Sequence, residues 1–449
     1  MRWRWITPVV QENLIVLGGS STAFGHRWTL SQLMRFWYLN CGLHPGRFPV
    51  HDTSRWDEFQ VINFHPRVFR DHDVDVKIEF CGVCGTDVHT ISGGWGPPTL
   101  PLIPGHEVIG YVTQIGKQVK SFGVGDRVGV GAQVGACFDC FSCRNGDEQY
   151  CPDHVHTYNA VDPVSGATCK GGFATAIRVH EQFVFPIPDE ISSEDAAPFM
   201  CAGLTMYSAL VRNGAGPGRR VGIIGLGGLG HLGVQFAKAL GCRDIVVLSH
   251  TPDKRRDALR FGATHFYDFI DDAAECQACF SQTLDLVIST LSVWKDYRDI
   301  IPLLRARGRI ILVGIPDDPL PVLGIYQLVI SGVLVGGSKI GNKSEVVEML
   351  KLAVEHGIRP QIEISSSMYG YFWIKIFTSR SLDVLVSSVG RAMRRVEEGR
   401  VRYRQVLRMD IHMAGVYQSS SEKLEFEFRR GNDRTAEHQS VYLLYPPGG

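Results

Sequence analysis

The feature that most constrains the fold of this chain is a glycine-rich turn between an apolar strand and an apolar helix. Arg220–Ile224 reads as a short buried strand, and residues 229–240 repeat apolar side chains at helical spacing before Gly241. Between them the chain reads G-x-G-x-x-G, and in this context backbone amides and the helix dipole can hold a pyrophosphate. The sequence therefore predicts a dinucleotide-binding turn and not a purely structural one. The residues predicted to form it are Gly225, Leu226, Gly227, Gly228, Leu229 and Gly230.

Strand-like and helix-like segments continue to alternate after this turn. Apolar runs at 245–248, 284–289, 309–313 and 333–335 are separated by segments such as 253–261, which carry helical spacing. Strands that alternate with helices predict a parallel, doubly wound sheet of the Rossmann type. We expect this α/β cofactor domain to span residues 202–340.

The end of the second strand of such a domain indicates which dinucleotide binds. An acidic residue there would contact the ribose 2′-hydroxyl of NAD. This chain has Ser249 and His250 instead, with Lys254 close behind. These side chains can donate hydrogen bonds to a 2′-phosphate, although the neighbouring Asp253 opposes the positive charge. The sequence therefore favours NADP(H) over NAD(H).

The region before residue 202 is rich in short alternating strands and carries most of the cysteines. Four of them read C-x2-C-x2-C-x7-C within one loop, a local convergence of thiols that suits a closed tetrahedral zinc site better than a disulfide framework. The predicted structural zinc ligands are Cys137, Cys140, Cys143 and Cys151.

A second set of residues has the composition of an open, catalytic zinc site. Cys84 and His106 lie within one stretch that also contains Glu107, and Cys201 is the leading candidate for a third ligand. Three protein ligands and one open position are typical of catalytic zinc. Each residue taken singly is more readily explained as a core thiol or a satisfied histidine than as a ligand, so the hypothesis rests on the combination. Cys81 is the rival ligand to Cys84, and we favour Cys84.

Composition excludes several classes of function. The 449 residues include 46 basic and 46 acidic side chains, so no charge excess indicates a nucleic acid or membrane partner. No apolar run reaches the roughly 18–20 residues that cross a bilayer. Thiols grouped for metal binding indicate a reducing compartment, so we expect a cytoplasmic protein that acts on a small molecule.

These motifs occur together, in this order and spacing, in a known family. GVCGTDVH, PGHEVIG, the four-cysteine loop, CAGLTMYSAL and GLGGLG resemble zinc-dependent medium-chain alcohol dehydrogenases. Within that family the chain is most similar to the NADP-dependent, fungal-type cinnamyl alcohol dehydrogenase branch, through Ser249, GGFA and VRYRQVL. The resemblance implies a GroES-like β-rich catalytic domain beside the Rossmann domain, two zinc ions per subunit, NADP(H), and a homodimer joined near residues 322–337.

The resemblance also implies roles for individual residues. Cys84, His106 and Cys201 would hold the catalytic zinc, with Asp87 orienting His106 and Glu107 as a nearby carboxylate. Thr86 and His89 would relay a proton to solvent, and Thr205 would touch the nicotinamide. Trp95 would line the substrate entrance, unless it is a core tryptophan. The implied reaction interconverts aldehydes and primary alcohols, aromatic or of medium length. The alternatives are a polyol dehydrogenase of the same fold and a catalytically impaired homologue that still binds cofactor.

Three segments depart from the family pattern. Residues 1–47 have no counterpart, residues 365–388 form an apolar insertion without a clear period, and residues 412–449 form a polar tail that we expect to be disordered. The catalytic domain is therefore expected to comprise residues 48–201 and 341–411, interrupted by the cofactor domain.

Overall fold

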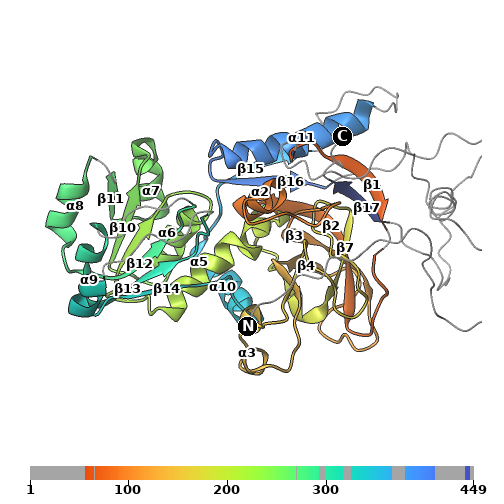
Figure 1. Cartoon of the computed structure of the whole chain (residues 1–449), viewed down its shortest axis with the longest axis horizontal. Helices are drawn as coiled ribbons and strands as arrows, with labels where there is room; N and C mark the ends of the chain where they lie inside the picture. Colours follow the sequence, from red (N-terminus) through yellow and green to blue (C-terminus); the bar gives the residue numbers. More distant parts are fainter. Residues whose placement is uncertain are drawn as a thin grey trace, which may run out of the picture. The chain divides into compact units, whose positions relative to one another are not determined.

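The computed structural model describes residues 56–64, 66–268, 271–292, 299–316, 325–366, 380–409 and 440–444. The extension 1–47 and most of the tail 412–449 therefore lie outside the described residues. Two large sheets organise the described part of the chain, and Figure 1 shows their strands and helices with the labels used below.

The six-stranded sheet is parallel throughout and confirms the predicted doubly wound fold. Its strands run in the spatial order β11-β10-β9-β12-β13-β14, which is the Rossmann order in which the first strand lies at the centre. The central pairing joins Ile223 of one strand to Val247 of the next. The strands are β9 (Arg220–Ile224), β10 (Asp244–Ser249), β11 (His265–Asp268), β12 (Leu284–Ser289), β13 (Leu304–Leu312) and β14 (Leu334–Gly337).

Helices connect these strands and supply the apolar surface that covers the sheet. The helix α6 packs against β9 and β10, while α7 and α8 pack against β11 and α9 against β13. The 3₁₀ turn η5 (Pro252–Lys254) leads into α7, so the helix predicted at 253–261 begins two residues late. The helices are α5 (Ala202–Arg212), α6 (Gly230–Ala239), α7 (Arg255–Phe261), α8 (Ala273–Phe280), α9 (Ile325–Ser331) and α10 (Lys343–His356).

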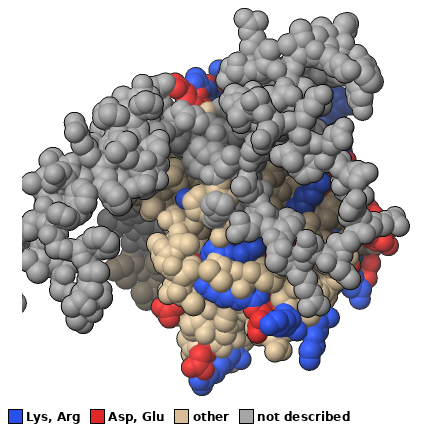
Figure 2. All heavy atoms as spheres, turned by 90° about the vertical axis from the view of Figure 1, so that its right-hand side faces the viewer, with Lys and Arg blue, Asp and Glu red and all other residues tan. Residues whose placement is uncertain are grey.

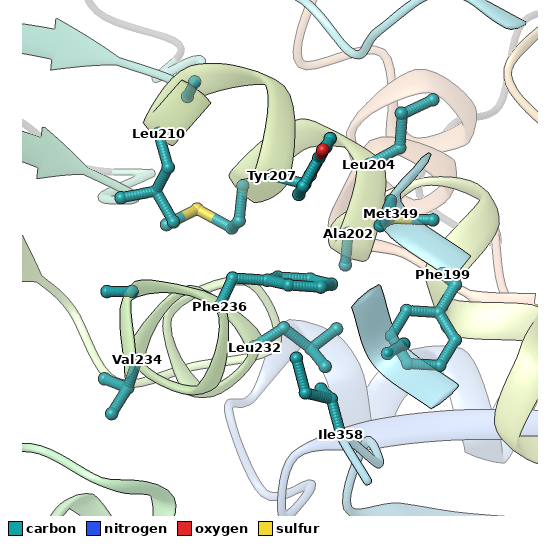
Figure 3. Close-up of a cluster of buried hydrophobic side chains, with 14 of the residues drawn as sticks. Phe199, Ala202, Leu204, Tyr207, Leu210, Leu232, Val234, Phe236, Met349 and Ile358 are labelled. Carbon is teal, nitrogen blue, oxygen red and sulfur yellow. The ribbon is translucent and has the colours of Figure 1, made fainter. Parts of the chain in front are cut away.

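The largest buried cluster lies where α5, α6 and α10 meet. Phe236 of α6 is fully buried, and its ring lies 6.1 Å from Phe199 and 5.7 Å from Tyr207. Figure 3 shows this ring between the two helices, with Met349 of α10 and Ile358 closing the cluster. Because Cys201 immediately precedes α5, this packing fixes the position of one predicted zinc ligand.

A seven-stranded, mostly antiparallel sheet forms the second unit of the fold. Its longest strand, β2, pairs with β3, β7 and β16, and only β15 and β16 run parallel. The strands are β2 (Asp73–Val83), β3 (Glu107–Ile115), β4 (Arg127–Val130), β7 (Ala176–His180), β8 (Val184–Pro186), β15 (Ile362–Ser366) and β16 (Arg404–Arg408). A separate pair joins β5 (Gln133–Gly135) to β6 (Val155–His156).

The polar residues that alternate with apolar ones at the start of β2 are not exposed to solvent. Asp73 and Asp75 are both buried, and each pairs with an arginine: Asp73 with Arg67 and Asp75 with Arg178, the latter at 2.7 Å. Buried carboxylates are stable when they are paired in this way. The polar positions of β2 therefore anchor neighbouring segments and do not face water.

Short helices complete this unit beside the sites described below. They are α2 (Gly85–Ser92), α3 (Phe141–Arg144) and α4 (Ser193–Ala196), with 3₁₀ turns η2 (Glu148–Tyr150), η3 (Glu181–Phe183) and η4 (Ala197–Met200). The longer helix α11 (Arg380–Glu397) also belongs to this unit, whereas the 3₁₀ turn η7 (Ile301–Leu303) precedes β13 in the parallel sheet.

Two segments differ from the sequence-based expectation. Residues 380–388, assigned to an insertion without a period, form the first half of α11, whose second half packs Val389 and Met393 into the core. Ser440–Leu444, in the tail expected to be disordered, forms β17 and pairs antiparallel with β1 (Gln60–Phe64). The run VYLL has the β-branched and aromatic composition of a strand, which a polar surrounding sequence concealed. Residues 367–379 lie outside the described residues.

The surface agrees with the balanced charge of the sequence. Figure 2 shows lysine and arginine together with aspartate and glutamate side chains on the visible part of one face. Among the helices that the structure describes, none combines the length and apolarity needed to cross a membrane.

Candidate active site

The three predicted catalytic zinc ligands lie together in the described structure. Cys84 follows β2 and precedes α2, His106 precedes β3, and Cys201 precedes α5. With Glu107 they form a buried group whose ligand atoms all lie within 4.8 Å of one another. Two thiols and an imidazole match the donor set of a catalytic zinc site, so the residues present fit the metal. The rival Cys81 is buried within β2, and its thiol donates to the carbonyl of Gly82, outside this group.

Asp87 holds His106 in the orientation that a metal ligand needs. Its carboxylate accepts from the His106 Nδ1 at 2.9 Å, from the Gly105 amide at 3.0 Å and from the Cys84 amide at 2.9 Å. The other ring nitrogen, Nε2, lies 3.2 Å from the Cys201 sulfur. Burial lowers the pKa of His106, but the Asp87 carboxylate and the Cys84 sulfur together raise it well above its ordinary value. A carboxylate on one ring nitrogen directs the other toward the metal position.

Arg404 is a residue of this site that the sequence analysis did not identify. It lies on β16, is almost fully buried, and its Nη2 donates to Glu107 Oε1. Its Nη1 also lies against the glycine turn, because a Cβ added to Gly228 would come within 2.8 Å of it. Burial raises the pKa of Glu107 to about 7 in spite of the adjacent guanidinium. A single buried cation therefore contacts both the zinc-site carboxylate and the predicted pyrophosphate loop.

Thr86 and His89, the predicted proton relay, both lie on α2 beside Cys84. The Cys84 thiol lies 3.7 Å from the Thr86 hydroxyl, and Thr86 and His89 are three residues apart on the helix, which places them on one face. The His89 ring stacks on Trp95 with centroids 5.2 Å apart. Trp95 is 39% exposed, so it is not a core tryptophan.

The four cysteines of the predicted structural zinc site also converge. Their sulfur atoms lie within 4.8 Å of one another, with Cys151 3.5 Å from Cys137. Backbone amides of the loop donate to these sulfurs, as in the 3.3 Å contact from the Cys140 amide to Cys137, and such donors lower the pKa of Cys137 to about 7. Four thiols with amide donors fit a closed zinc site.

Ion pairs and hydrogen bonds join this loop to α5 and α10, the helices through which the chain enters and leaves the parallel sheet. Arg212, at the end of α5, pairs with Asp147 of the loop at 2.7 Å and with Glu345 of α10 at 2.6 Å. Asn342, the N-cap of α10, accepts from the Glu345 amide and donates through its side chain to the Gly146 carbonyl. We call Asp147, Arg212, Asn342 and Glu345 the loop clamp.

The glycine turn has the backbone geometry of a phosphate-binding loop. Gly225 has a φ of +88°, and a Cβ on Gly230 would lie 2.0 Å from the Gly225 carbonyl oxygen. A Cβ on Gly227 would meet nothing within 4 Å, so the backbone there borders open space. Leu226 is buried and Leu229 packs against the core, which fixes the turn from behind. The loop therefore fits a bound pyrophosphate.

The other predicted cofactor residues lie on α5 and at or after the end of β10. Thr205 is buried one helical turn after Cys201, whose carbonyl accepts from the Thr205 amide at 2.9 Å. Ser249 ends β10, directly after Leu248, whose carbonyl accepts from the Gly225 amide. His250 is exposed, and Lys254 ends the 3₁₀ turn that follows.

Comparison with known proteins identifies the family. Residues 70–189 match the model of the alcohol dehydrogenase GroES-like domain, and residues 228–355 match that of the zinc-binding dehydrogenase. The NADP-dependent alcohol dehydrogenase 6 of Saccharomyces cerevisiae is 39% identical over 362 residues, which cover 80% of this chain and 94% of that protein. The chain belongs to the zinc-dependent alcohol dehydrogenases.

Other relatives of this alcohol dehydrogenase are named cinnamyl alcohol dehydrogenases, the branch that the motifs resemble. A probable cinnamyl alcohol dehydrogenase of Oryza sativa is 40% identical over 75% of this chain and 86% of its own length. The structure of a cinnamyl alcohol dehydrogenase from Sorghum bicolor matches with a TM-score of 0.72 and 38% identity, covering 81% of this chain and 97% of that one. That of CAD from Helicobacter pylori, complexed with NADP(H), matches with a TM-score of 0.68 and 30% identity, covering 78% and 98%. The GroES-like and Rossmann fold class is therefore confirmed.

Proposed function

We propose that this enzyme transfers a hydride between NADP(H) and an aldehyde or primary alcohol, with Cys84, His106 and Cys201 as the ligands of its catalytic zinc. The observation that carries the proposal is the buried group of these three side chains, with His106 oriented by Asp87. A zinc ion held there would polarise a carbonyl oxygen and stabilise an alkoxide, while the nicotinamide carries the hydride. Cys137, Cys140, Cys143 and Cys151 hold a second, structural zinc.

The chain's own residues then have distinct tasks. Asp87 keeps the His106 Nδ1 protonated and its Nε2 directed at the metal position. The Thr86 hydroxyl passes a proton between the substrate oxygen and the cofactor ribose, and the His89 imidazole, which can both donate and accept a proton, links this relay to solvent. Thr205 contacts the nicotinamide end of the cofactor, and Trp95, stacked on His89, lines the substrate entrance.

NADP(H) is supported by the residues after β10 and by the relatives. Ser249 stands where an acidic residue would select NAD, and His250 and Lys254 add donors for a 2′-phosphate. Several relatives are named NADP-dependent alcohol dehydrogenases. The cinnamyl alcohol dehydrogenase relatives support an aromatic aldehyde as substrate.

The test is oxidation of NADPH by the purified, zinc-loaded protein with cinnamaldehyde and a series of aliphatic aldehydes, run in parallel with NADH. We expect turnover with NADPH to exceed that with NADH by at least about tenfold, since one charge-assisted contact is worth about 1.5–3 kcal/mol. A preference for NADH would contradict the cofactor assignment, and bound zinc and NADPH without turnover of any aldehyde would favour the catalytically impaired alternative.

A polyol dehydrogenase remains the second candidate because of one relative. A probable mannitol dehydrogenase of Medicago sativa is 37% identical over 80% of this chain and 93% of its length. Adding fructose and mannitol to the substrate series separates the two functions: faster turnover of the polyol pair than of any simple aldehyde would establish this candidate.

We also propose a homodimer joined through α9 and β14. Residues predicted for this contact, from 325 onward, expose Ile325, Tyr326, Val329, Ile330 and Leu334 by 59–79% each. The strand β14 is the outer strand of the parallel sheet, so a second copy can continue it. Light scattering should give twice the 49.8 kDa chain mass, and Val329→Arg should halve it. A wild-type mass of one chain would contradict the dimer.

We place the enzyme in the cytoplasm, because two thiolate zinc sites require reduced cysteines and the cysteines that the structure describes are all free. Fractionation of cells that express the tagged chain tests this, and recovery in a secreted or membrane fraction would contradict it.

A further inference from the structure

The two residues that precede β16, Arg402 and Tyr403, contact helices α6 and α7 of the cofactor domain. The ring of Tyr403 stacks on His231 of α6, with centroids 5.1 Å apart and planes 16° from parallel. The Tyr403 hydroxyl donates to Asp257 of α7 at 2.7 Å. Arg402, the preceding residue, is thereby brought beside the start of α7, although it lies 145 residues from Asp257 in the sequence.

Lys254, predicted above to bind the cofactor, points toward this segment. Its Nζ lies 5.7 Å from the centroid of the Tyr403 ring, which is within the range of a cation–π contact. Burial lowers the pKa of Lys254, and the positive charge of Arg402 lowers it further, while Asp257 opposes the shift. Two cations from distant parts of the chain are therefore held near each other immediately after β10.

The carboxylate of Asp257 is shared between two arginines, so it does not neutralise the positive charge gathered around it. Asp257 accepts from Arg402 at 2.9 Å through one oxygen and from Arg260 at 3.2 Å through the other. Among the described residues Lys254 makes no ion pair, and the neighbouring Asp253 is exposed without one. Three cations thus face one carboxylate. An excess of buried or half-buried positive charge is stabilised when an anion binds.

We propose that Arg402 is a specificity-determining residue that binds the 2′-phosphate of NADP(H) together with Lys254. This inference rests on the proposed NADP(H) cofactor. The phosphate would lie after β10, where Ser249 and His250 supply further donors, and Arg402 would reach it from the other domain. Arginine suits this task because its planar guanidinium can pair with Asp257 through one edge and with a phosphate through another.

The arrangement also explains how one site would reject NAD(H). Without a 2′-phosphate, Lys254 and Arg402 stay close together, and the Asp257 carboxylate beside them is also paired with Arg260. With the phosphate, both cations gain a partner, and the domain that carries the zinc ligands gains a direct contact with the adenosine end of the cofactor. The discrimination therefore comes from two segments of the chain, 249–254 and 402–403.

Binding of 2′,5′-ADP and of 5′-AMP, measured by calorimetry on the zinc-loaded protein, tests this without any need for turnover. Arg402→Ala should weaken 2′,5′-ADP by about 10- to 100-fold, as expected for a charge-assisted contact, and leave 5′-AMP unchanged. Arg402→Lys should retain most of the difference between the two ligands. The matched control is Arg400→Ala, which removes an exposed arginine two residues away that pairs with Glu398.

Asp257→Asn separates phosphate binding from a purely structural ion pair. It keeps the acceptor for Tyr403 but removes the competing charge, so 2′,5′-ADP should bind at least as tightly as to the wild type. If Arg402 served only to pair with Asp257, then Asp257→Asn and Arg402→Ala would behave alike, and the inference would be overturned. An unchanged 2′,5′-ADP affinity in Arg402→Ala would overturn it too. A wild-type protein that binds 5′-AMP as tightly as 2′,5′-ADP would contradict the NADP(H) assignment itself.

Discussion

Cys84→Ala is expected to abolish aldehyde reduction and to remove one of two bound zinc ions. The thiol belongs to the buried group that also contains His106 and Cys201, and an alanine leaves only two protein ligands. Stabilisation of the transition-state charge by the metal is worth several kcal/mol, so we expect turnover to fall by about three orders of magnitude or more. Metal analysis and NADPH oxidation on the same preparation measure both effects.

Two cysteine variants control this result. Cys81→Ala removes a buried thiol three residues away that lies outside the ligand group, so it should retain both zinc ions and most of the activity. Cys151→Ser should also lose one zinc, but from the four-cysteine loop, with lower thermal stability as its main effect. If Cys81→Ala lost the catalytic zinc and Cys84→Ala kept it, the ligand assignment would be wrong.

Arg404→Met is expected to cause the largest loss of stability among single changes near the site. The substitution preserves much of the side-chain volume but leaves Glu107 buried without its counter-ion. Breaking a buried ion pair from one side costs about 3–5 kcal/mol, and we expect the lower end because burial already raises the pKa of Glu107 to about 7. The fall in the free energy of unfolding is measured by denaturant titration monitored through tryptophan fluorescence.

The double variant Arg404→Met with Glu107→Gln identifies the cause. Replacing the carboxylate by a neutral amide removes the unpaired charge, so the double variant should recover part of the stability that the single variant lost. Cofactor affinity should stay reduced in both, because Arg404 also lies against Gly228 of the glycine turn. Equal stability of the single and double variants would show that the buried charge is not what Arg404 stabilises.

Local patterns in the sequence were sufficient to predict the parallel sheet. The strands β9, β10 and β12 lie where short apolar runs indicated them, because strands buried on both faces need continuous apolar sequence. Local sequence patterns did not predict a strand whose formation depends on residues far away in the sequence. The strand β17 exists through its pairing with β1. The insertion proved to continue into α11, where Leu382, Leu385, Val386 and Val389 have a helical spacing that the sequence interpretation overlooked.

The same distinction applies to the site. Cys84, His106 and the four-cysteine loop could be predicted because metal ligands keep characteristic residue types and spacings. Arg404 was missed because it meets Glu107 across 297 residues, and an arginine in a strand has no local signal that separates it from a surface residue. Asp87 was assigned only through the family resemblance, and its three hydrogen bonds give that assignment a physical basis.

The loop clamp connects the four-cysteine loop to parts of the enzyme that contain none of its zinc ligands. The chain enters the parallel sheet through α5 and leaves it through α10, and Arg212 and Asn342 bind both of these crossings to Gly146 and Asp147. A metal held by the four cysteines would therefore stabilise both ends of the cofactor domain as well as its own loop. Oxidation of the loop or loss of its metal would then be expected to loosen the attachment of α5 and α10, although none of the catalytic zinc ligands lies in the loop.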